Sequence, residues 1–237
     1  MNRLPQPPRR LAIVGRGRVG TALAASFRHA GVEVEGPLGR GEEPGADIVL
    51  LCVPDTQIAA AARAVDARLV GHTSGATPLD DVDFGLHPLQ AVTGADTSFE
   101  GSGCAIAGRS AEALELAREL ARAVGMQPFE IDDAARAAYH ASASIASNFL
   151  VTLEWMAERV AAAAGIGPED ARRMLAPLVR QTVDNWAELG PRAALTGPVA
   201  RGDELTVARQ RRAIQDAAPD LLPLFDALVA GTREVAA

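Results

Sequence analysis

The sequence predicts an α/β protein with a doubly wound sheet in its first part and an all-helical second part. In residues 10–31, a short apolar run leads into a glycine-rich turn and then into a helical segment. Short apolar runs and helical segments go on alternating up to residue 131, as they do in doubly wound sheets. From residue 132 onward the sequence contains helical segments only. We therefore expect one domain at residues 1–131 and a second, helical domain at residues 132–237.

The strands of the first domain are predicted from the length and spacing of the apolar runs. Leu11–Val14 is a short apolar run that leads directly into Gly15, and Val32–Glu35 alternates apolar with charged residues, as a half-buried strand does. Asp47–Val53 is a continuous apolar run, which is typical of a parallel strand that is buried on both faces. Further strands are expected at residues 68–71, 82–86, 103–107 and 128–131, and helices at 21–30, 57–64 and 111–124.

The second domain is predicted to be built around one long helix. Residues 134–164 contain neither proline nor glycine, and a stretch of that length is about twice a usual helix. Such a helix commonly forms the core of a second domain or a dimer interface, so we expect a homodimer through this domain. Three more helical segments follow at residues 168–189, 203–214 and 219–235.

The glycine-rich turn, Gly15-Arg16-Gly17-Arg18-Val19-Gly20, has the spacing G-x-G-x-x-G between a strand and a helix. Gly15 allows a tight turn, Gly17 lets a pyrophosphate approach the backbone, and Gly20 lets the helix pack closely on the strand. The start of the helix then offers free N–H groups and a partial positive charge to the phosphates. The turn predicts a Rossmann-type domain that binds a dinucleotide, with these six residues in the binding site.

The residues around the second strand favour NADP(H) over NAD(H). NAD sites usually carry an acidic residue at the end of that strand, and Glu33 and Glu35 lie in this region. Arg16 in the turn and Arg40 just beyond the strand are instead suited to binding a 2′-phosphate. Simple solvation of both guanidinium groups is the alternative, and it would leave NAD(H) as the cofactor. The predicted cofactor site is completed by Val53, Pro54 and Ser74, at the ends of the third and fourth strands.

Composition argues against several classes of function. The formal net charge is −7 and the basic residues do not cluster, which argues against a nucleic-acid ligand. No apolar run reaches the roughly 18 residues of a transmembrane helix, and residues 1–10 form a polar lead-in without the apolar core of a signal peptide. We therefore expect a cytoplasmic protein, with Cys52 and Cys104 as buried thiols rather than a disulfide. No metal site is predicted.

Lysine is absent from the chain. All 23 basic residues are arginines, so a Schiff-base lysine or a lysine general acid is excluded. Catalytic groups must therefore be of other types, and the ligands of open α/β sheets gather at the carboxyl ends of the strands. Ser74 and His87 each follow a predicted strand there, beside the expected nicotinamide. Ser74 is expected to hydrogen-bond cofactor or substrate, whereas His87 is either catalytic or a loop histidine bonded to backbone.

Seven segments of the chain carry a resemblance to a known family: GRGRVGTAL, VLLCVPDTQI, GHTSGA, GLHPLQAV, CAIAG, YHASASIASNFL and LTGPVARGD. They resemble the bacterial Rossmann-like proteins with a DUF2520 domain over essentially the whole chain, most specifically through HPLQ and LTGPVARGD. The layout is also similar to the superfamily of 6-phosphogluconate dehydrogenase, β-hydroxyacid dehydrogenase, pyrroline-5-carboxylate reductase and ketopantoate reductase. The resemblance implies an NAD(P)-dependent reductase that buries its substrate between the two domains. The substrate expected from it is a small 2-oxo acid like ketopantoate, or an imine.

The resemblance also implies roles for residues of the long helix. His140, Ser144 and Asn148 recur every four residues and would share one face of an unbroken helix. In β-hydroxyacid dehydrogenases and ketopantoate reductases this helix carries a catalytic lysine and, four residues later, an asparagine. Asn148 matches the asparagine and would orient the acceptor atom, but Ser144 stands in place of the lysine, so His140 or His87 is expected to donate the proton. The alternative is that this stripe is a helix-packing seam with a polar edge.

Two further segments complete the predicted site. In LTGPVARGD, Asp203 is the expected N-cap of the next helix, while Thr196 and Arg201 are the expected substrate-binding residues. Arg201 suits a bidentate grip on a carboxylate, with a surface role as the alternative. His87-Pro88 resembles the His-Pro of prephenate dehydrogenases, so a dehydrogenase that uses His87 as base stays open. A non-catalytic NADP-binding sensor also stays open, because the missing lysine is consistent with lost chemistry.

Overall fold

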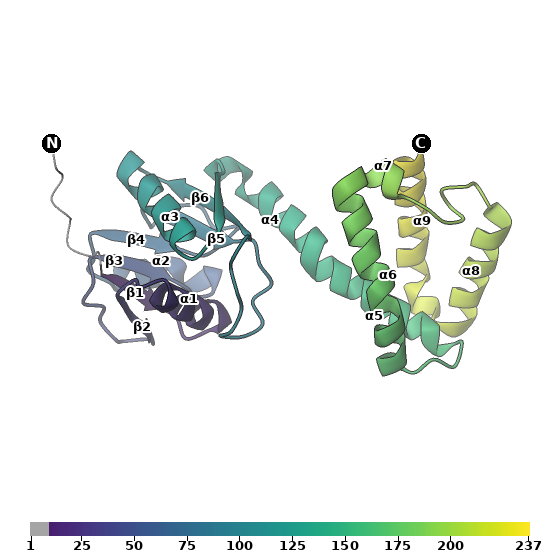
Figure 1. Cartoon of the computed structure of the whole chain (residues 1–237), viewed down its shortest axis with the longest axis horizontal. Coiled ribbons are helices and arrows are strands. Elements are labelled where there is room, and N and C mark those ends of the chain that lie inside the picture. Colours follow the sequence, from purple (N-terminus) through teal and green to yellow (C-terminus); the bar gives the residue numbers. More distant parts are fainter. Residues whose placement is uncertain (1–9) are drawn as a thin grey trace. The chain divides into compact units, whose positions relative to one another are not determined.

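The computed structural model describes residues 10–237, and residues 1–9 of the predicted lead-in lie outside the described part of the chain. The chain divides into two compact units, one that ends at Ser147 and one that spans Asn148–Ala237. Figure 1 shows a sheet with its helices in the first unit and helices alone in the second. The division lies beyond the predicted boundary at residue 131, because residues 132–147 belong to the first unit, where Arg136 is buried beside Gly85 of the sheet.

The first unit is built on one seven-stranded sheet in the order β2-β1-β3-β4-β5-β6-β7. Neighbouring strands run parallel except for β5 and β6, which are antiparallel. Every predicted strand is present, and the second shows a clear shift, from the predicted Val32–Glu35 to Val34–Leu38. The strands are β1 (Leu11–Val14), β2 (Val34–Leu38), β3 (Ile48–Leu51), β4 (Leu69–His72), β5 (Phe84–Pro88), β6 (Gly103–Gly108) and β7 (Gln127–Glu130).

The antiparallel pair reflects the connection between β5 and β6. Residues 89–102 join these two strands without a helix. Antiparallel neighbours can be joined in this way, whereas parallel neighbours need a longer crossover that is usually helical. The strands from β4 to β6 therefore follow one another without intervening helices, and the sheet is mixed at that side.

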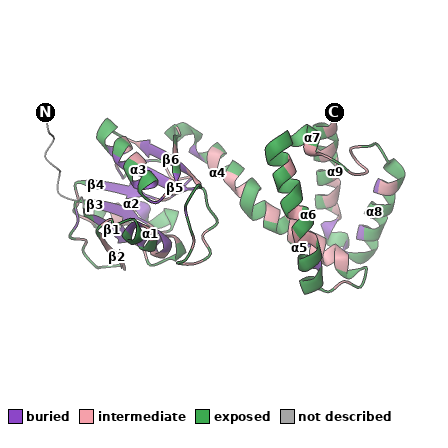
Figure 2. Cartoon of the chain, viewed as in Figure 1, coloured by how far each residue is buried: buried purple, intermediate pink, exposed green. Residues whose placement is uncertain are grey.

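Alternate residues of the central strands fill two separate cores. Leu11 and Ile13 pack in the same core as α1 (Arg18–His29) and α3 (Ala111–Ala123), whereas Ala12 packs in the core that includes Ile58 of α2 (Ile58–Arg63). Successive side chains of a strand point to opposite faces, so a continuous apolar run contributes to both cores. Figure 2 shows these central strands as buried, as their apolar sequences predict.

The predicted long helix is not one regular α-helix. A 3₁₀ turn (Asp133–Ala135) precedes α4 (Arg136–Ser144), and a π-helical turn (Ile145–Phe149) separates α4 from α5 (Leu150–Ala162). A π-helix hydrogen-bonds residue i to residue i+5 and so winds less per residue than an α-helix. The π-helical turn therefore interrupts the regular helix between Ser144 and Asn148, and the shared face of His140, Ser144 and Asn148 stays a prediction.

The second unit consists of helices around a small buried cluster. Asp203 caps α8 as predicted, because its carboxylate accepts a hydrogen bond from the Thr206 amide at 3.1 Å. The central cluster consists of Met156, Ile214, Ala218 and Leu221. None of the helices in residues 10–237 is long and apolar enough to cross a membrane. The helices that follow α5 are α6 (Pro168–Leu189), α7 (Pro191–Ala194), α8 (Glu204–Ala217) and α9 (Leu222–Ala236), with a 3₁₀ turn at Pro219–Leu221.

Candidate functional site

Backbone packing at the end of β1 explains two of the three turn glycines. Gly15 has a φ of +122°, which favours glycine, and a Cβ there would overlap the carbonyl oxygen of Cys52. A Cβ on Gly20 would overlap the carbonyl oxygen of Gly15. In the sheet β1 lies between β2 and β3, so the turn sits where the strand order reverses. Open α/β sheets bind their ligands at this place.

Gly17 differs from the other two glycines, because a Cβ there would meet no atom within 4 Å. Gly17 is the N-cap of α1, and the first turn of that helix has neither a capping side chain nor an acidic residue. The first amides of α1 therefore stay available to an anion, next to open space. This cradle fits the pyrophosphate of a dinucleotide, whose approach a side chain at position 17 would obstruct.

The end of β2 carries arginine rather than an acidic residue. The strand extends to Leu38, so that Gly39 and Arg40 follow it, and Arg40 donates a hydrogen bond to the side-chain oxygen of Gln57 at 3.4 Å. Glu35 lies within the strand, where its carboxylate accepts a hydrogen bond from the Gly45 amide at 3.0 Å. Arg16 is exposed and pairs with both carboxylate oxygens of Glu42, at 2.9 and 2.6 Å. Glu35 and Glu42 thus have partners within the protein, and Arg40 is the first charged residue after the strand.

One cavity of about 530 Å³ joins the glycine turn to the two predicted histidines, and its lining residues all belong to the first unit. The residues that line it do not include Arg16, Arg40 or Ser144. They do not include Gly15 or Gly20 either, whose role is the backbone packing described above. The predicted site residues that line the cavity are Gly17, Arg18, Val19, Val53, Pro54, Ser74, His87 and His140.

His87 is held by a tyrosine that the sequence analysis did not single out. Its Nδ1 lies 2.7 Å from the hydroxyl oxygen of Tyr139, and the two rings meet edge to face. Burial, reinforced by the nearby His140 and Arg136, lowers the pKa of His87 to about 4, while burial raises the pKa of Tyr139 to about 12. At neutral pH both groups are uncharged, and in the tautomer that carries the His87 proton on Nε2 the phenol donates to Nδ1.

His140 comes from α4 and lines the cavity beside His87. The centroids of the two imidazole rings are 5.7 Å apart. Gly75 makes room for both rings, since a Cβ there would lie 2.7 Å from Nδ1 of His140 and 3.0 Å from Nε2 of His87. Nδ1 of His140 is buried and has no hydrogen-bond partner within residues 10–237. Because buried polar atoms normally have partners, this nitrogen is a candidate contact for a bound ligand.

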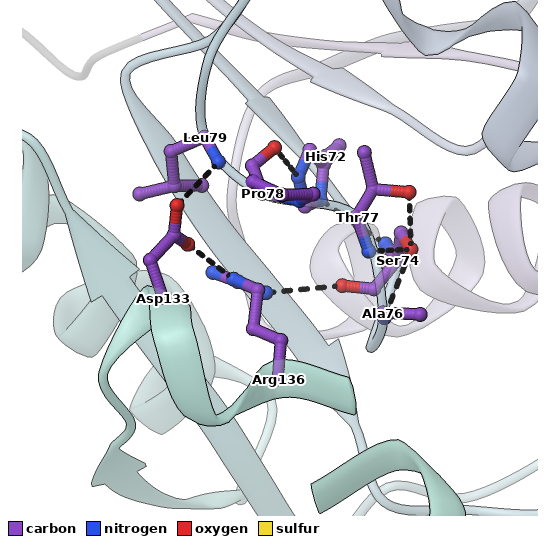
Figure 3. Close-up of polar contacts among 8 residues, drawn as sticks. All are labelled: His72, Ser74, Ala76, Thr77, Pro78, Leu79, Asp133 and Arg136. Atoms are coloured by element: carbon purple, nitrogen blue, oxygen red, sulfur yellow. Dashed lines mark hydrogen bonds and ion pairs between the residues drawn. The ribbon is translucent and has the colours of Figure 1, made fainter. Parts of the chain in front are cut away.

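Ser74 is fully engaged by other protein groups. Its hydroxyl donates to the Asp55 carboxylate at 2.9 Å and accepts from the amides of Ala76 and Thr77 at 3.2 and 2.9 Å. Its own amide donates to Nδ1 of His72 at 3.2 Å. Ser74 therefore organises the loop that follows β4, as Figure 3 shows for the Ala76 and Thr77 contacts. The predicted cofactor contact of its side chain stays a prediction.

A buried polar cluster adjoins this loop (Figure 3). Burial lowers the pKa of His72, whose Nε2 lies 3.3 Å from a backbone carbonyl oxygen. Arg136, in the first turn of α4, donates to the Asp133 carboxylate at 2.5 Å and to the Ser74 carbonyl oxygen at 3.4 Å. Asp133 also accepts a hydrogen bond from the Leu79 amide at 3.0 Å. The cluster thus ties the start of α4 to the loop that lines the cavity.

Sequence reasoning missed Tyr139, Arg136 and Asp55, although each had a signal. Tyr139 is the single tyrosine of the chain and directly precedes His140. Arg136 lies one helical turn before His140, and Asp55 follows the apolar run of the third strand, at the edge where ligands were expected. The sequence did not show that α4 packs against β5, which is what brings Tyr139 to His87.

Two predictions concern cysteines and metals. Cys52 and Cys104 are free thiols, and burial raises the pKa of each to about 12. Neither thiol is therefore a ready nucleophile at neutral pH. In the part of the chain that the structure describes, no group of three or more His, Cys, Asp or Glu side chains is arranged to hold a metal ion.

The remaining predicted residues, Asn148, Thr196 and Arg201, belong to the second unit. All three are exposed on that unit. Thr196 and Arg201 lie in the connection between α7 and α8, and Asn148 lies in the π-helical turn. Their substrate contacts stay predictions.

The sequence profile of a family described as a domain of unknown function, DUF2520, matches residues 102–232, which is more than half of the chain. The chain belongs to the DUF2520 family. The resemblance drawn from the seven sequence segments is thereby confirmed. A search among curated proteins found no match to this DUF2520 protein.

The DUF2520 protein shares its fold with solved structures of low sequence identity. TM1727 from Thermotoga maritima has a TM-score of 0.81 at 22% identity, over 95% of this chain and 99% of that one. BF3122 from Bacteroides fragilis, a proposed NADP oxidoreductase, has a TM-score of 0.78 at 18% identity, over 95% and 98% of the two chains. A reductive aminase from Aspergillus terreus, in complex with NADPH and ethyl levulinate, has a TM-score of 0.67 at 13% identity, over 96% and 95%. These likenesses confirm the predicted fold class.

Proposed function

We propose that the DUF2520 protein is an NADP(H)-dependent oxidoreductase that reduces a carbonyl or imine group of a small molecule. One observation carries the proposal. A single cavity is lined at the open start of α1 by Gly17 and Arg18 and is also lined by His87 and His140. A reductase needs these two parts together, a cradle for the dinucleotide and a proton source beside it. The NADPH-bound reductive aminase of similar fold supports the proposal.

The cofactor is proposed to bind along the carboxyl ends of the first strands. The amides at the start of α1 would hold the pyrophosphate, and Arg40 after β2 would bind the 2′-phosphate. Arg16 would also bind the 2′-phosphate when its ion pair with Glu42 is broken. NAD(H) is the weaker choice, because the carboxylate of Glu35 already accepts the Gly45 amide. When bound, NADPH would supply the hydride.

His87 is the proposed donor to the reacting oxygen or nitrogen. As a neutral imidazole with its proton on Nε2, it donates a hydrogen bond to a carbonyl or imine without carrying charge itself. In carbonyl reduction that proton passes to the product oxygen, and the Tyr139 hydroxyl passes its own proton to Nδ1. His87 stays neutral throughout, and the phenolate of Tyr139 regains a proton from solvent. An alkoxide is much more basic than a phenolate, so this transfer is favourable even with the raised pKa of Tyr139.

The proposed substrate is a small 2-oxo acid like ketopantoate, or an imine. His140, with its unpartnered Nδ1, is the second group proposed to contact it. For Asn148, Thr196 and Arg201 a substrate-binding role is proposed from the family resemblance and from residue type, with Arg201 suited to a carboxylate. Ser144 is proposed as a polar neighbour rather than a replacement for the lysine, because a hydroxyl does not titrate in the useful range.

The second unit is proposed to form a homodimer. Its surface exposes an unusual number of large apolar side chains, and monomeric proteins rarely expose such extended apolar surface. On α6, Met174 and Leu178 are exposed and four residues apart, so they are neighbours on one side of the helix, and Trp186 is exposed further along it. Trp155 of α5 is exposed as well. A second copy of this unit offers a face of the same chemistry.

Binding and turnover test the proposed function in two steps. Calorimetric titration with NADPH and with NADH is expected to show tighter binding of NADPH. NADPH oxidation is then measured with a panel of 2-oxo acids and cyclic imines, for the wild type and for His87→Gln. The account expects turnover with one member of the panel and its loss in the variant.

The other outcomes decide between the alternatives. Absence of binding by either dinucleotide contradicts the proposal. Tight NADPH binding with no oxidation across the panel supports the sensor instead. Reduction of NADP⁺ by a cyclic alcohol, without reduction of any oxo acid, supports the dehydrogenase in which His87 acts as base.

A further inference from the structure

We propose that Arg136 is a positioning residue: its buried guanidinium docks the face of α4 that carries Tyr139 and His140 onto the sheet and sets the charge that these groups experience. The catalytic consequence of this inference rests on the proposed function, whereas its structural part does not. Arg136 does not line the cavity itself but donates to the carbonyl oxygen of Ser74, which does, so it acts through its neighbours.

The first observation is a burial that stability alone does not explain. Arg136 is only 2% exposed, and it is the largest of the fully buried side chains. Its Nε and Nη1 have the partners described above, but Nη2 is buried with no hydrogen-bond partner within the described residues. An incompletely paired buried charge opposes folding, and an apolar side chain of similar volume would often serve stability better. A role outside stability is therefore indicated.

The second observation is the helix face on which Arg136 lies. Arg136, Tyr139 and His140 are related as i, i+3 and i+4, so they share one face of α4. Tyr139 bonds to His87, and a Cβ on Gly85 would lie 2.6 Å from Nη2 of Arg136. Gly85 and His87 are two residues apart on β5 and so lie on the same face of the sheet. This face of α4 therefore docks on one face of β5, and the missing side chain of Gly85 makes room for the guanidinium.

The third observation is the set of charges around His87. The groups that influence the pKa of His87 come from three elements. They are His72 from β4, Asp55 from the turn after β3, and Arg136 and His140 from α4. In addition, the Tyr139 hydroxyl is hydrogen-bonded to Nδ1 of His87. Burial is the largest influence, His140 and Arg136 lower the pKa further, and Asp55 opposes them. The charge of Arg136 also lowers the pKa of Tyr139, against the larger effect of burial. A cation at this place favours a neutral imidazole and a proton-donating phenol together.

The test measures the two hydrogen-bonded groups directly, in the full-length protein without cofactor. The ring nitrogens of ¹⁵N-labelled histidine are followed by NMR through a pH titration, with His87 assigned from its loss in His87→Gln. In Arg136→Met, which removes the charge and keeps much of the side-chain length, the pKa of His87 is expected to rise by about one unit or more. Arg118→Met is the matched control, because Arg118 is largely buried and ion-paired on α3 but has no influence on His87.

Two further variants separate charge from position. Arg136→Lys keeps the charge but loses the planar fork, so the His87 pKa is expected to stay low while the ¹⁵N shift of Nδ1 reports a weakened bond to Tyr139. Gly85→Ala displaces Nη2 without removing any charge and is expected to have the same effect on Nδ1. Tyr139→Phe gives the shift of an Nδ1 that has lost its partner. If Arg136→Met does not fold, these variants still decide the positioning claim.

The result that overturns the inference is an unchanged His87 pKa in folded Arg136→Met together with an unchanged Nδ1 shift in Arg136→Lys and Gly85→Ala. This result is independent of the proposed function, because no cofactor is present. Conversely, failure of the protein to bind NADPH would overturn the proposed function and leave the NMR result standing. If a substrate is found, kcat is expected to fall in Arg136→Met while the Kd for NADPH changes by less than about twofold, roughly 0.4 kcal/mol.

Discussion

The two units of the chain differ in how far each is complete by itself. The first unit buries its central strands on both faces of the sheet, and its cavity is lined from within the unit. The second unit has a small buried cluster that includes Met156, and most of its helical backbone is coloured as exposed or intermediate in Figure 2. Its exposed large apolar side chains include Trp155, Leu178 and Trp186. The proposed cofactor site is thus lined within one unit, whereas the second unit exposes apolar side chains that the proposed homodimer would cover.

The comparison also shows where sequence patterns carry structural information. In the first unit, Gly15 and Gly20 are required by contacts with neighbouring backbone, so packing alone explains them. Gly17 has no such contact, and the proposed pyrophosphate is what would account for it. In the second unit, Arg201 and Thr196 have only residue type and family resemblance to support a role. A sequence motif therefore indicates function at those positions that contacts within the protein do not explain.

The largest expected effect is on the second unit. The double variant Leu178→Glu/Trp186→Glu places two charges on the exposed face of α6 and is expected to weaken the homodimer by about 100-fold or more, since aromatic anchors dominate such interfaces. Sedimentation velocity across a concentration series measures this. Ala111→Glu, at the exposed start of α3, is the control and should leave assembly unchanged. A wild-type protein that stays monomeric at all concentrations contradicts the dimer.

A large effect is also expected at Gly17, in the first unit. Gly17→Ala is expected to weaken NADPH binding by about tenfold or more, roughly 1.4 kcal/mol, while the protein stays folded, because the added Cβ meets only the space reserved for the pyrophosphate. Gly167→Ala is a closely matched control. Gly167 is the N-cap of α6, its φ of −67° is close to the −73° of Gly17, and a Cβ there also meets nothing. Equal NADPH affinity in both variants would contradict the cradle.

A smaller effect is expected from the arginine that follows β2. Arg40→Ala is expected to reduce the preference for NADPH over NADH by about tenfold, since a charge-assisted bond to the 2′-phosphate is lost while NADH has no such group. The control is Arg63→Ala. Arg63 is the last residue of α2, and this variant breaks its exposed ion pair with Asp81. The affinities come from calorimetry with each dinucleotide. A parallel loss of both affinities would point instead to a general effect on the fold.

A pH dependence of stability is also expected in the first unit. The folded-state pKa of His87 is about 4, below the ordinary 6.5, so between these values the unfolded chain binds a proton that the folded chain does not. The free energy of unfolding is therefore highest above pH 6.5 and falls as the pH drops toward 4. His72, with a pKa that is also lowered, contributes in the same direction. Urea unfolding at pH 7 and pH 5 is expected to show a smaller drop in His87→Gln than in the wild type.

Much of the first unit could be predicted from the sequence, because its strands obey physical rules that leave a pattern in the sequence. The second unit has no such pattern. The run Asp47–Val53 could be recognised because a strand buried on both faces needs apolar residues at every position, and β3 lies within it. His87 was a candidate because it follows the predicted strand at residues 82–86, and the structure places it within β5, near the carboxyl end of that strand. Tyr139 and Arg136 could not be singled out from the sequence, because their roles depend on the docking of α4 on β5, which no local pattern encodes. The π-helical turn likewise has no breaker residue to mark it.

The central claim is that the glycine turn and the two histidines form one binding site for NADPH. The most direct measurement is a titration of the ¹⁵N-labelled protein with NADPH, followed through backbone amide and histidine ring signals. The account predicts saturable shifts at Gly17, Arg18 and Val19 together with shifts at the rings of His87 and His140, and no comparable shifts for His29 at the far end of α1. Saturable binding that leaves the Gly17 and His87 signals unmoved would contradict it.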